Sequence, residues 1–300
     1  MTKSAEQQWA AALGTGPTRA VRRVAAASLG GRTEAFYEAS GGEPVVVTGL
    51  LDGDATLGGL DLAGMQAVLA GVELEGYSRE TSERETFSAG EFFAELRSGR
   101  ARHNVVDHPV ASTPLRGRVG APPFFGSNWI ADGGEGLTIS PLSLTLTPAG
   151  NFTPLHVDSY GMQGWMLLLE GLKCWRFVAP EHARPRMDPV SADVGDAPPS
   201  AWNGVERLET ELRGGELMFI PPGWAHVVWT PEASVGVGGS VLNEHVLEAT
   251  LASWHSELAL GHSDEVDVAA LAARAIAVGN DAPSLRRGLT AHDRWQHARS

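Results

Sequence analysis

A series of short β-strand segments, separated by glycines and prolines, occupies the middle of this 300-residue sequence. The predicted strands are 137–147, 152–157, 162–169, 172–178, 216–220, 227–229 and 234–242. Short strands at such regular intervals predict a closed barrel or a double-sheet jelly roll, which is a double-stranded β-helix. The 36 glycines and 18 prolines follow no repeat and fit a chain with many turns.

The segments before this β-rich centre combine helical and strand patterns. Residues 1–40 are predicted to form two short helices, because apolar residues such as Val21 and Val24 recur at helical spacing. A β-branched run at 43–50 predicts a strand, and 89–100 predicts an amphipathic helix.

Three regions follow from these patterns. An N-terminal helical segment covers 1–40, a mainly β domain with flanking helices covers 41–243, and a C-terminal helical region covers 244–300. The last region either covers the barrel or forms a homodimer contact, and the sequence does not choose between these alternatives.

The charge and the cysteine content exclude several classes of function. A formal net charge of −13 offers no basic surface for nucleic acid or for anionic membranes, whereas a basic peptide or a cationic small molecule fits it. A single cysteine, Cys174, excludes an intramolecular disulfide and fits a reducing compartment. Apolar runs are too short to span a bilayer, and the first residues lack the pattern of a secretory signal. We therefore expect a cytoplasmic protein.

A candidate metal site begins with His156 and Asp158, which lie two residues apart next to a predicted strand. Alternate strand residues point to one face, so both side chains can reach into a barrel. The pattern alone is weak, because with 10 His and 36 acidic residues about one such pair is expected by chance. Two similar pairs, at His255 and His262, fall in the predicted helical tail, where residues two apart do not share a face. The strand context therefore favours His156 and Asp158 over a purely structural histidine.

The third candidate ligand, His226, ends the sequence Gly-Glu-Leu-Met-Phe-Ile-Pro-Pro-Gly-Trp-Ala-His. Gly215 lets the chain turn into a strand, and Pro221 and Gly223 form a tight corner that leads to His226. This stretch resembles the second cupin motif, Gly-x5-Pro-x-Gly-x2-His, at every fixed position up to the histidine. The later asparagine of that motif is Thr230 here.

The first cupin motif is similar to the residues around Gly150, His156 and Asp158, with aspartate in place of the second histidine of metal cupins. This replacement is typical of the oxygenase branch. Two imidazoles and one carboxylate on one side of iron(II) leave coordination positions open for substrate and dioxygen. The resemblance implies a cupin barrel with iron(II) held by His156, Asp158 and His226.

Residues 153–177 resemble the Jumonji-C (JmjC) domain, and most of all its lysyl-hydroxylase-like branch. Seven residues after Asp158 stands Trp165, followed by Gly-Leu-Lys-Cys-Trp around Lys173, as in that branch. JmjC proteins are iron(II)- and 2-oxoglutarate-dependent oxygenases. The resemblance implies that Lys173 pairs with the distal carboxylate of 2-oxoglutarate and that Thr153 donates a hydrogen bond to it.

The strand pattern gives independent reason to place Lys173 in the barrel. It shares a face with Trp175 and Phe177, whereas Arg176 points the other way, so the ammonium lies on the apolar side. A buried cation needs an anion. The alternative is that this face is the outer one and that Lys173 is solvated.

The other cosubstrate residues carry open alternatives. Thr153 lies opposite the first histidine in a regular strand, so its role depends on a bend, and Trp165 is equally a core residue. Met166 stands where the lysyl-hydroxylase-like branch often has asparagine, and Ser240 or Gly239 falls where many members place asparagine or threonine. Both departures border cosubstrate or substrate.

The implied reaction is hydroxylation of a C–H bond with iron(II), 2-oxoglutarate and dioxygen, for which the protein supplies ligation and orientation. Demethylation applies the same chemistry to an N-methyl carbon. The substrate is either a protein or peptide side chain or a small molecule such as an amino acid or a natural-product intermediate. Two other classes remain: a metal cupin that does not use 2-oxoglutarate, such as an isomerase or another dioxygenase, and an inactive binding module.

Overall fold

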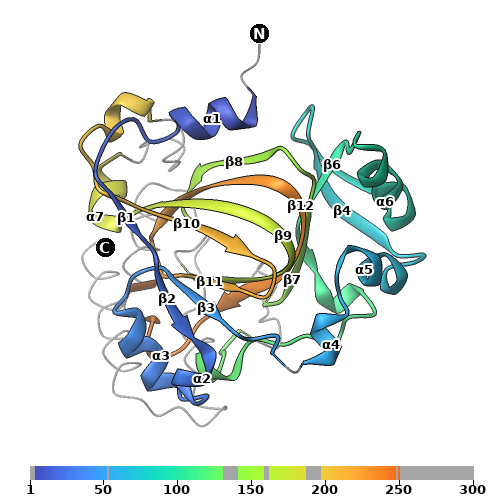
Figure 1. The fold of residues 1–300 in the computed structure, drawn as a ribbon, viewed down its shortest axis with the longest axis horizontal. Coiled ribbons are helices and arrows are strands. Elements are labelled where there is room, and N and C mark those ends of the chain that lie inside the picture. Colours follow the sequence, from blue (N-terminus) through green and yellow to red (C-terminus); the bar gives the residue numbers. More distant parts are fainter. Residues whose placement is uncertain are drawn as a thin grey trace, which may run out of the picture.

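The computed structural model describes residues 4–52, 54–130, 141–158, 162–186, 197–247 and 249–250. Within them, 12 strands join into one sheet that curves into a barrel (Figure 1). The predicted mainly β fold, a jelly roll with flanking helices, is thereby confirmed. Nearly all of the helical region predicted at 244–300, with its proposed homodimer contact, lies outside the described residues.

Two long strands, β9 (Gln163–Val178) and β12 (Ala225–Val241), pair antiparallel along their whole length and belong to both layers of the barrel. In one layer they pair with β8 (Asn151–His156) and β10 (Arg207–Arg213), and β10 also pairs with β1 (Thr18–Ala20). In the other layer they pair with β7 (Ser143–Thr147) and β11 (Leu217–Ile220), and β11 also pairs with β3 (Val45–Thr48).

The sequence analysis predicted each long strand as two shorter strands separated by a break. The break was wrong, because both strands are continuous. The glycine of the expected break, Gly171, adopts φ 97° within β9, and a Cβ there would lie 2.3 Å from the carbonyl oxygen of Ala233. Opposite it, the register of β12 shifts between Trp229 and Val235. Bulges and glycine let a paired strand bend without ending, so the chain passes from one layer to the other.

The N-terminal segment contains strands where only helices were predicted. Helix α1 (Ala5–Ala11) is followed by β1 (Thr18–Ala20) and β2 (Arg22–Ala25), and then by the helices α2 (Ala26–Leu29) and α3 (Thr33–Ser40). Strand β1 pairs in parallel with β10, and β2 pairs in parallel with β3. The helical prediction over residues 18–25 was therefore wrong, because pairing with distant strands overrides a weak local pattern.

A smaller group of elements extends the second layer at its edge (Figure 1). Strand β6 (His103–Pro109) pairs with β7 and with β4 (Glu73–Ser78), which in turn pairs with β5 (Arg84–Ser88). The sequence did not predict these three strands. The helices between β3 and β6 along the chain are α4 (Ala55–Gly58), α5 (Leu62–Val68) and α6 (Ala89–Ser98), of which α6 matches the helix predicted at 89–100.

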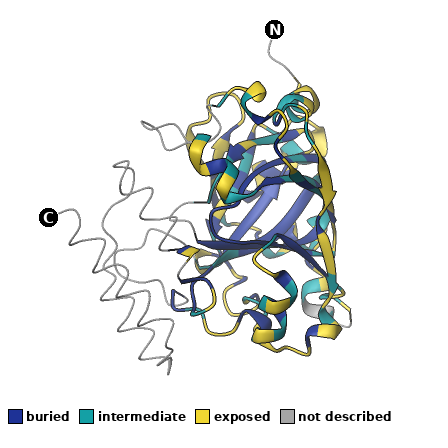
Figure 2. Cartoon of the chain, turned by 90° about the vertical axis from the view of Figure 1, so that its left-hand side faces the viewer, coloured by how far each residue is buried: buried dark blue, intermediate teal, exposed yellow. Residues whose placement is uncertain are grey.

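The remaining helices are short. They are α7 (Pro180–Ala183) and the 3-10 helices η1 (Val110–Ser112), η2 (Pro123–Phe125), η4 (Arg184–Arg186) and η6 (Pro199–Trp202). Figure 2 shows buried strands inside and exposed residues mainly on the helices and loops around them. In the described part of the chain, no helix is long and apolar enough to cross a membrane.

Candidate active site

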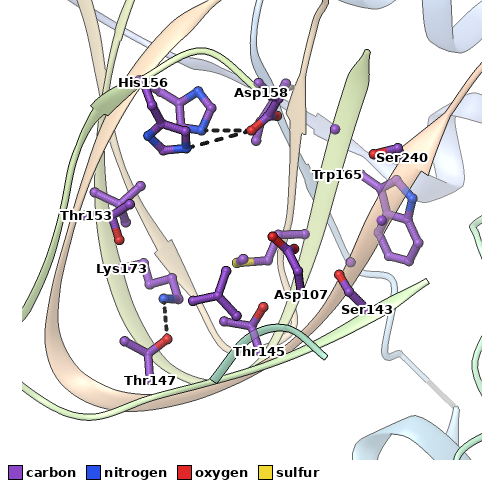
Figure 3. A pocket seen from close by; sticks show the side chains of 18 of the residues that line it. Asp107, Ser143, Thr145, Thr147, Thr153, His156, Asp158, Trp165, Lys173 and Ser240 are labelled. Atoms are coloured by element: carbon purple, nitrogen blue, oxygen red, sulfur yellow. Dashed lines mark hydrogen bonds and ion pairs between the residues drawn. The ribbon is translucent and has the colours of Figure 1, made fainter. Parts of the chain in front are cut away.

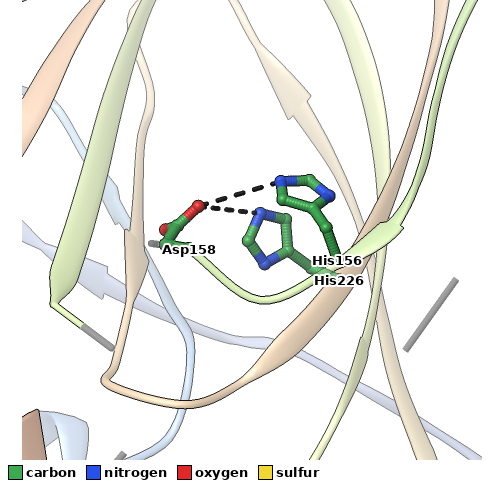
Figure 4. Close-up of side chains that lie close together, drawn as sticks. All are labelled: His156, Asp158 and His226. Carbon is green, nitrogen blue, oxygen red and sulfur yellow. Dashed lines mark ion pairs between the residues drawn. The ribbon is translucent and has the colours of Figure 1, made fainter. Parts of the chain in front are cut away.

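Three potential metal ligands meet where β8 ends and β12 begins (Figure 4). His156 is the last residue of β8, Asp158 follows it, and His226 is the second residue of β12, directly opposite His156 in the register. The Oδ1 atom of Asp158 lies 3.8 Å from Nε2 of His156 and 3.6 Å from Nε2 of His226. One ligand atom from each residue therefore lies within 4.8 Å of the others, close enough to share one ion.

Backbone carbonyl groups fix the orientation of both imidazole rings. Nδ1 of His156 donates to the carbonyl oxygen of Pro154 at 2.8 Å, and Nδ1 of His226 donates to that of Trp224 at 3.1 Å. With Nδ1 protonated, Nε2 is the free nitrogen, and it faces Asp158 in both rings. Burial lowers the pKa of His226 well below its usual value, which keeps the imidazole in the neutral form that a metal requires.

A glycine leaves room for the carboxylate. Gly164 lies in β9, and a Cβ atom at this position would be 2.6 Å from Oδ2 of Asp158. Any larger residue would force the aspartate to move. The sequence analysis did not single out Gly164, because its role depends on a contact between separate segments.

The three residues open into a cavity of about 480 Å³ between the two layers of the barrel (Figure 3). Its wall contains all of the predicted site residues. These are Thr153, His156, Asp158, Trp165, Lys173, His226 and Ser240.

Lys173 is buried in this cavity, with 4% of its surface exposed. Its Nζ atom donates to Oγ1 of Thr147 at 3.0 Å and to Oγ1 of Thr230 at 3.3 Å. Among the described residues, no carboxylate forms an ion pair with it. Burial lowers the pKa of Lys173 to about 7, because an ammonium loses its hydration there. The inner position excludes the solvated alternative for this side chain.

A bulge in β8 brings Thr153 onto the same wall as His156. In the register with β12, His226 pairs with His156 and Val228 pairs with Thr153, so three steps on β8 match two on β12. The extra residue reverses the alternation of side chains. Figure 3 shows Thr153 between His156 and Lys173.

Trp165 and Ser240 lie across the cavity from Lys173 (Figure 3). Trp165 is 3% exposed and also belongs to the main hydrophobic core, where its ring centroid lies 6.0 Å from that of Phe125. Its indole nitrogen has no hydrogen-bond partner among the described residues. Trp165 is thus both a core residue and part of the cavity wall.

Several cavity residues were missed by the sequence analysis. Strand β7 contributes Ser143, Thr145 and Thr147, and the strands at the edge contribute Asp107 and Arg84, among others. The alternation Ser-Leu-Thr-Leu-Thr in β7 was a usable signal, because it puts three hydroxyls on one face. Asp107 gave no such signal.

Comparisons with known proteins support the resemblance drawn from the motifs. The chain is 30% identical over 99 residues to the JmjC domain-containing histone demethylation protein 1 of Aspergillus fumigatus, a match that covers 32% of the chain and 7% of that relative. It is 24% identical over 160 residues to the 2-oxoglutarate and iron-dependent oxygenase JMJD4 of Danio rerio, over 49% of the chain and 36% of that relative. It is 28% identical over 106 residues to the bifunctional arginine demethylase and lysyl-hydroxylase psr-1 of Caenorhabditis elegans, over 30% of the chain and 26% of that relative.

The chain is similar to JmjC-domain proteins. In each of these three comparisons the matched residues span no more than 36% of the length of the relative. A comparison with descriptions of known protein families gives no match.

The JmjC-like site fits iron(II) by its donor set. Two neutral imidazoles and one carboxylate form the facial arrangement of non-haem iron oxygenases, with the remaining positions open. Both histidines carry the backbone hydrogen bonds that orient metal ligands.

Proposed function

We propose that this chain is an iron(II)- and 2-oxoglutarate-dependent oxygenase that hydroxylates a C–H bond of a protein or peptide side chain. The observation that carries the proposal is the combination, in one cavity, of a two-histidine, one-carboxylate cluster with a buried lysine that has no carboxylate partner in the described residues. The names of the relatives support this type of reaction. Two of these names, a histone demethylation protein and an arginine demethylase and lysyl-hydroxylase, also support a side-chain substrate.

His156, Asp158 and His226 would hold the metal. Bound iron supplies the redox chemistry by which one oxygen atom of dioxygen goes to the substrate and the other to 2-oxoglutarate, which yields succinate and carbon dioxide. The protein contributes ligation on one side of the ion and leaves the cavity side for cosubstrate and substrate.

Lys173 would bind the distal carboxylate of 2-oxoglutarate. An ammonium buried among threonine hydroxyls gains most from an anionic partner, because its present partners carry no charge. Thr153 lies between Lys173 and His156 and would donate a hydrogen bond to the same carboxylate. Trp165 and Ser240, on the other side of the cavity, would border the substrate.

Succinate release tests the proposal. Purified protein incubated with iron(II), ascorbate and 2-oxoglutarate should release succinate slowly even without substrate, and calorimetry should show binding of 2-oxoglutarate. A metal cupin of another kind would bind iron but not 2-oxoglutarate, and an inactive module would release no succinate. Absence of both signals from iron-loaded protein would refute the assignment.

The substrate class needs a second assay. A cell-extract digest is incubated with the protein and 2-oxoglutarate and then analysed by mass spectrometry. A peptide whose mass increases by 16 Da would identify a side-chain substrate. Turnover of free amino acids or other small molecules alone would show that the substrate is a small molecule and not a protein side chain. A peptide whose mass decreases by 14 Da would indicate removal of a methyl group.

A further inference from the structure

Strand β6 contains a bulge that faces the cavity. In its register with β7, Val105 pairs with Leu146 and His108 pairs with Leu144, so three steps on β6 match two on β7. Within this irregularity, Asp107 has φ 56°, one of two positive φ values among the non-glycine residues described. Aspartate tolerates the left-handed region better than most residues, yet such a conformation costs free energy and is concentrated at functional sites.

The bulge changes the direction of the Asp107 side chain. In a regular strand Asp107 would share the face of Val105, which is fully buried in the hydrophobic core. Instead, Val106 and Asp107 both line the cavity, and His108 takes the buried side. Nδ1 of His108 accepts a hydrogen bond from the backbone N–H of Glu75 at 3.1 Å, which holds this arrangement.

Asp107 lines the cavity as an exposed residue and forms no ion pair among the described residues. Figure 3 shows it on the wall below Asp158, and Ser143 donates a hydrogen bond to it. Arg84, which also lines the cavity, forms an ion pair with Glu75 at 2.6 Å, and Lys173 donates hydrogen bonds to two threonines. Burial and the Asp158 carboxylate raise the pKa of Asp107, whereas the charges of His156 and Arg84 and the hydrogen bond from Ser143 act in the opposite direction.

We infer that Asp107 determines substrate specificity by binding a cationic group, an ammonium or a guanidinium, of the side chain that is hydroxylated. The inference rests on the proposed function, since the cation would be held beside the metal ligands. A carboxylate that lines the cavity and forms no ion pair within the protein is available to pair with a cation, and the net charge of −13 favours the approach of a basic substrate.

Matched pairs of probes test this inference. Protein loaded with iron(II) and 2-oxoglutarate is titrated without oxygen with N-acetyl-lysine amide and N-acetyl-arginine amide, and with their neutral counterparts of norleucine and citrulline. The same residues at the centre of degenerate peptide pools form a second arm, which distinguishes a free amino acid from a peptide. Calorimetry or NMR then gives each dissociation constant without any turnover.

The variants are Asp107→Asn and Asp107→Gly, both of which accept a positive φ. We expect the cationic probe to bind the wild type more tightly than its neutral counterpart, and each variant to lose about tenfold or more of that affinity. Glu38→Gln, on the exposed surface of α3, removes one charge outside the cavity and should change nothing. The second variant secures the test in case the first does not fold.

Two results would overturn the inference. One is equal binding of the cationic and neutral probes in both arms, including no binding of either. The other is a preference for the cation that survives in both Asp107 variants. Binding of 2-oxoglutarate is measured on the same samples. Absence of 2-oxoglutarate binding would count against the proposed function, whereas 2-oxoglutarate binding without a preference for the cationic probe would count against Asp107 alone.

Discussion

Lys173 donates a hydrogen bond to Thr230 at 3.3 Å across the two long strands of the barrel. Thr230 stands where the second cupin motif has asparagine, so this departure from the motif falls beside the predicted cosubstrate lysine. Thr147, from the other layer, supplies the second acceptor at 3.0 Å. Both acceptors are uncharged, which leaves the ammonium able to pair with a ligand carboxylate.

Replacement of Lys173 should separate cosubstrate binding from metal binding. Lys173→Met removes the cation but fills a similar volume, so we expect 2-oxoglutarate affinity to fall about tenfold or more while iron binding stays intact. The protein without cosubstrate should become about 1–3 kcal/mol more stable, because an ammonium without an anion is no longer buried. Calorimetry, iron analysis and urea unfolding measure the three effects. Unchanged 2-oxoglutarate affinity would contradict the role of Lys173.

The pKa of Lys173 predicts a pH dependence of 2-oxoglutarate binding. Burial lowers this pKa to about 7, so the lysine is protonated below that pH and largely neutral above it. A bound dicarboxylate favours the protonated form. The dissociation constant should therefore be nearly constant below pH 7 and rise by up to about tenfold per pH unit above it.

Calorimetry between pH 6.5 and 9 measures this profile. Lys173→Arg keeps its charge throughout this range and should give a flat profile, and the weak residual binding of Lys173→Met should also be flat. A wild-type profile without a rise above pH 7 would show that the lysine stays charged in the free protein.

Patterns between neighbours in the chain were sufficient to predict much of this structure. The two-residue alternation placed His156 and Asp158 together, and the proline-glycine corner before His226 predicted the third ligand. The strand alternation also put Lys173 on the inner face. These features depend on residues within one strand or turn, which is why they could be read from the sequence.

Features set by contacts between distant segments could not be predicted in this way. The bulges that turn Thr153 and Asp107 into the cavity depend on register with a partner strand. Strands β1 and β2 form because β10 and β3 offer free edges. The room that Gly164 leaves for Asp158 also exists only in the folded barrel.

Gly164 is expected to be necessary for metal binding. Gly164→Ala places a methyl group 2.6 Å from Oδ2 of Asp158, so the carboxylate must move from its position between the two histidines. We expect iron affinity to fall about tenfold or more, as for other groups that orient metal ligands. Gly120→Ala, where an added Cβ meets no atom within 4 Å, is the matched control. Equal iron affinity in all three proteins, measured by competition with a chelator, would exclude this role.

The metal assignment itself is tested by removing a ligand. His156→Ala should abolish stoichiometric iron binding, because two remaining ligands hold iron(II) weakly. His182→Ala, in α7 and outside the cavity wall, is the control for loss of a histidine. Metal analysis after gel filtration provides the measurement, and full iron content in the His156 variant would place the site elsewhere.

Thr153 tests whether the bulge in β8 serves cosubstrate binding. Thr153→Val keeps the β-branched shape but removes the hydroxyl, so the strand and its bulge should persist while a hydrogen bond to the 2-oxoglutarate carboxylate is lost. A hydrogen bond to a charged group predicts a loss of affinity of roughly tenfold, with iron content unchanged. Thr153→Ser keeps the hydroxyl and should retain most of the affinity. If the Thr153→Val and Thr153→Ser variants bind 2-oxoglutarate equally well, the bulge positions Thr153 for packing alone. Lys173 must then hold the carboxylate together with Thr147 and Thr230.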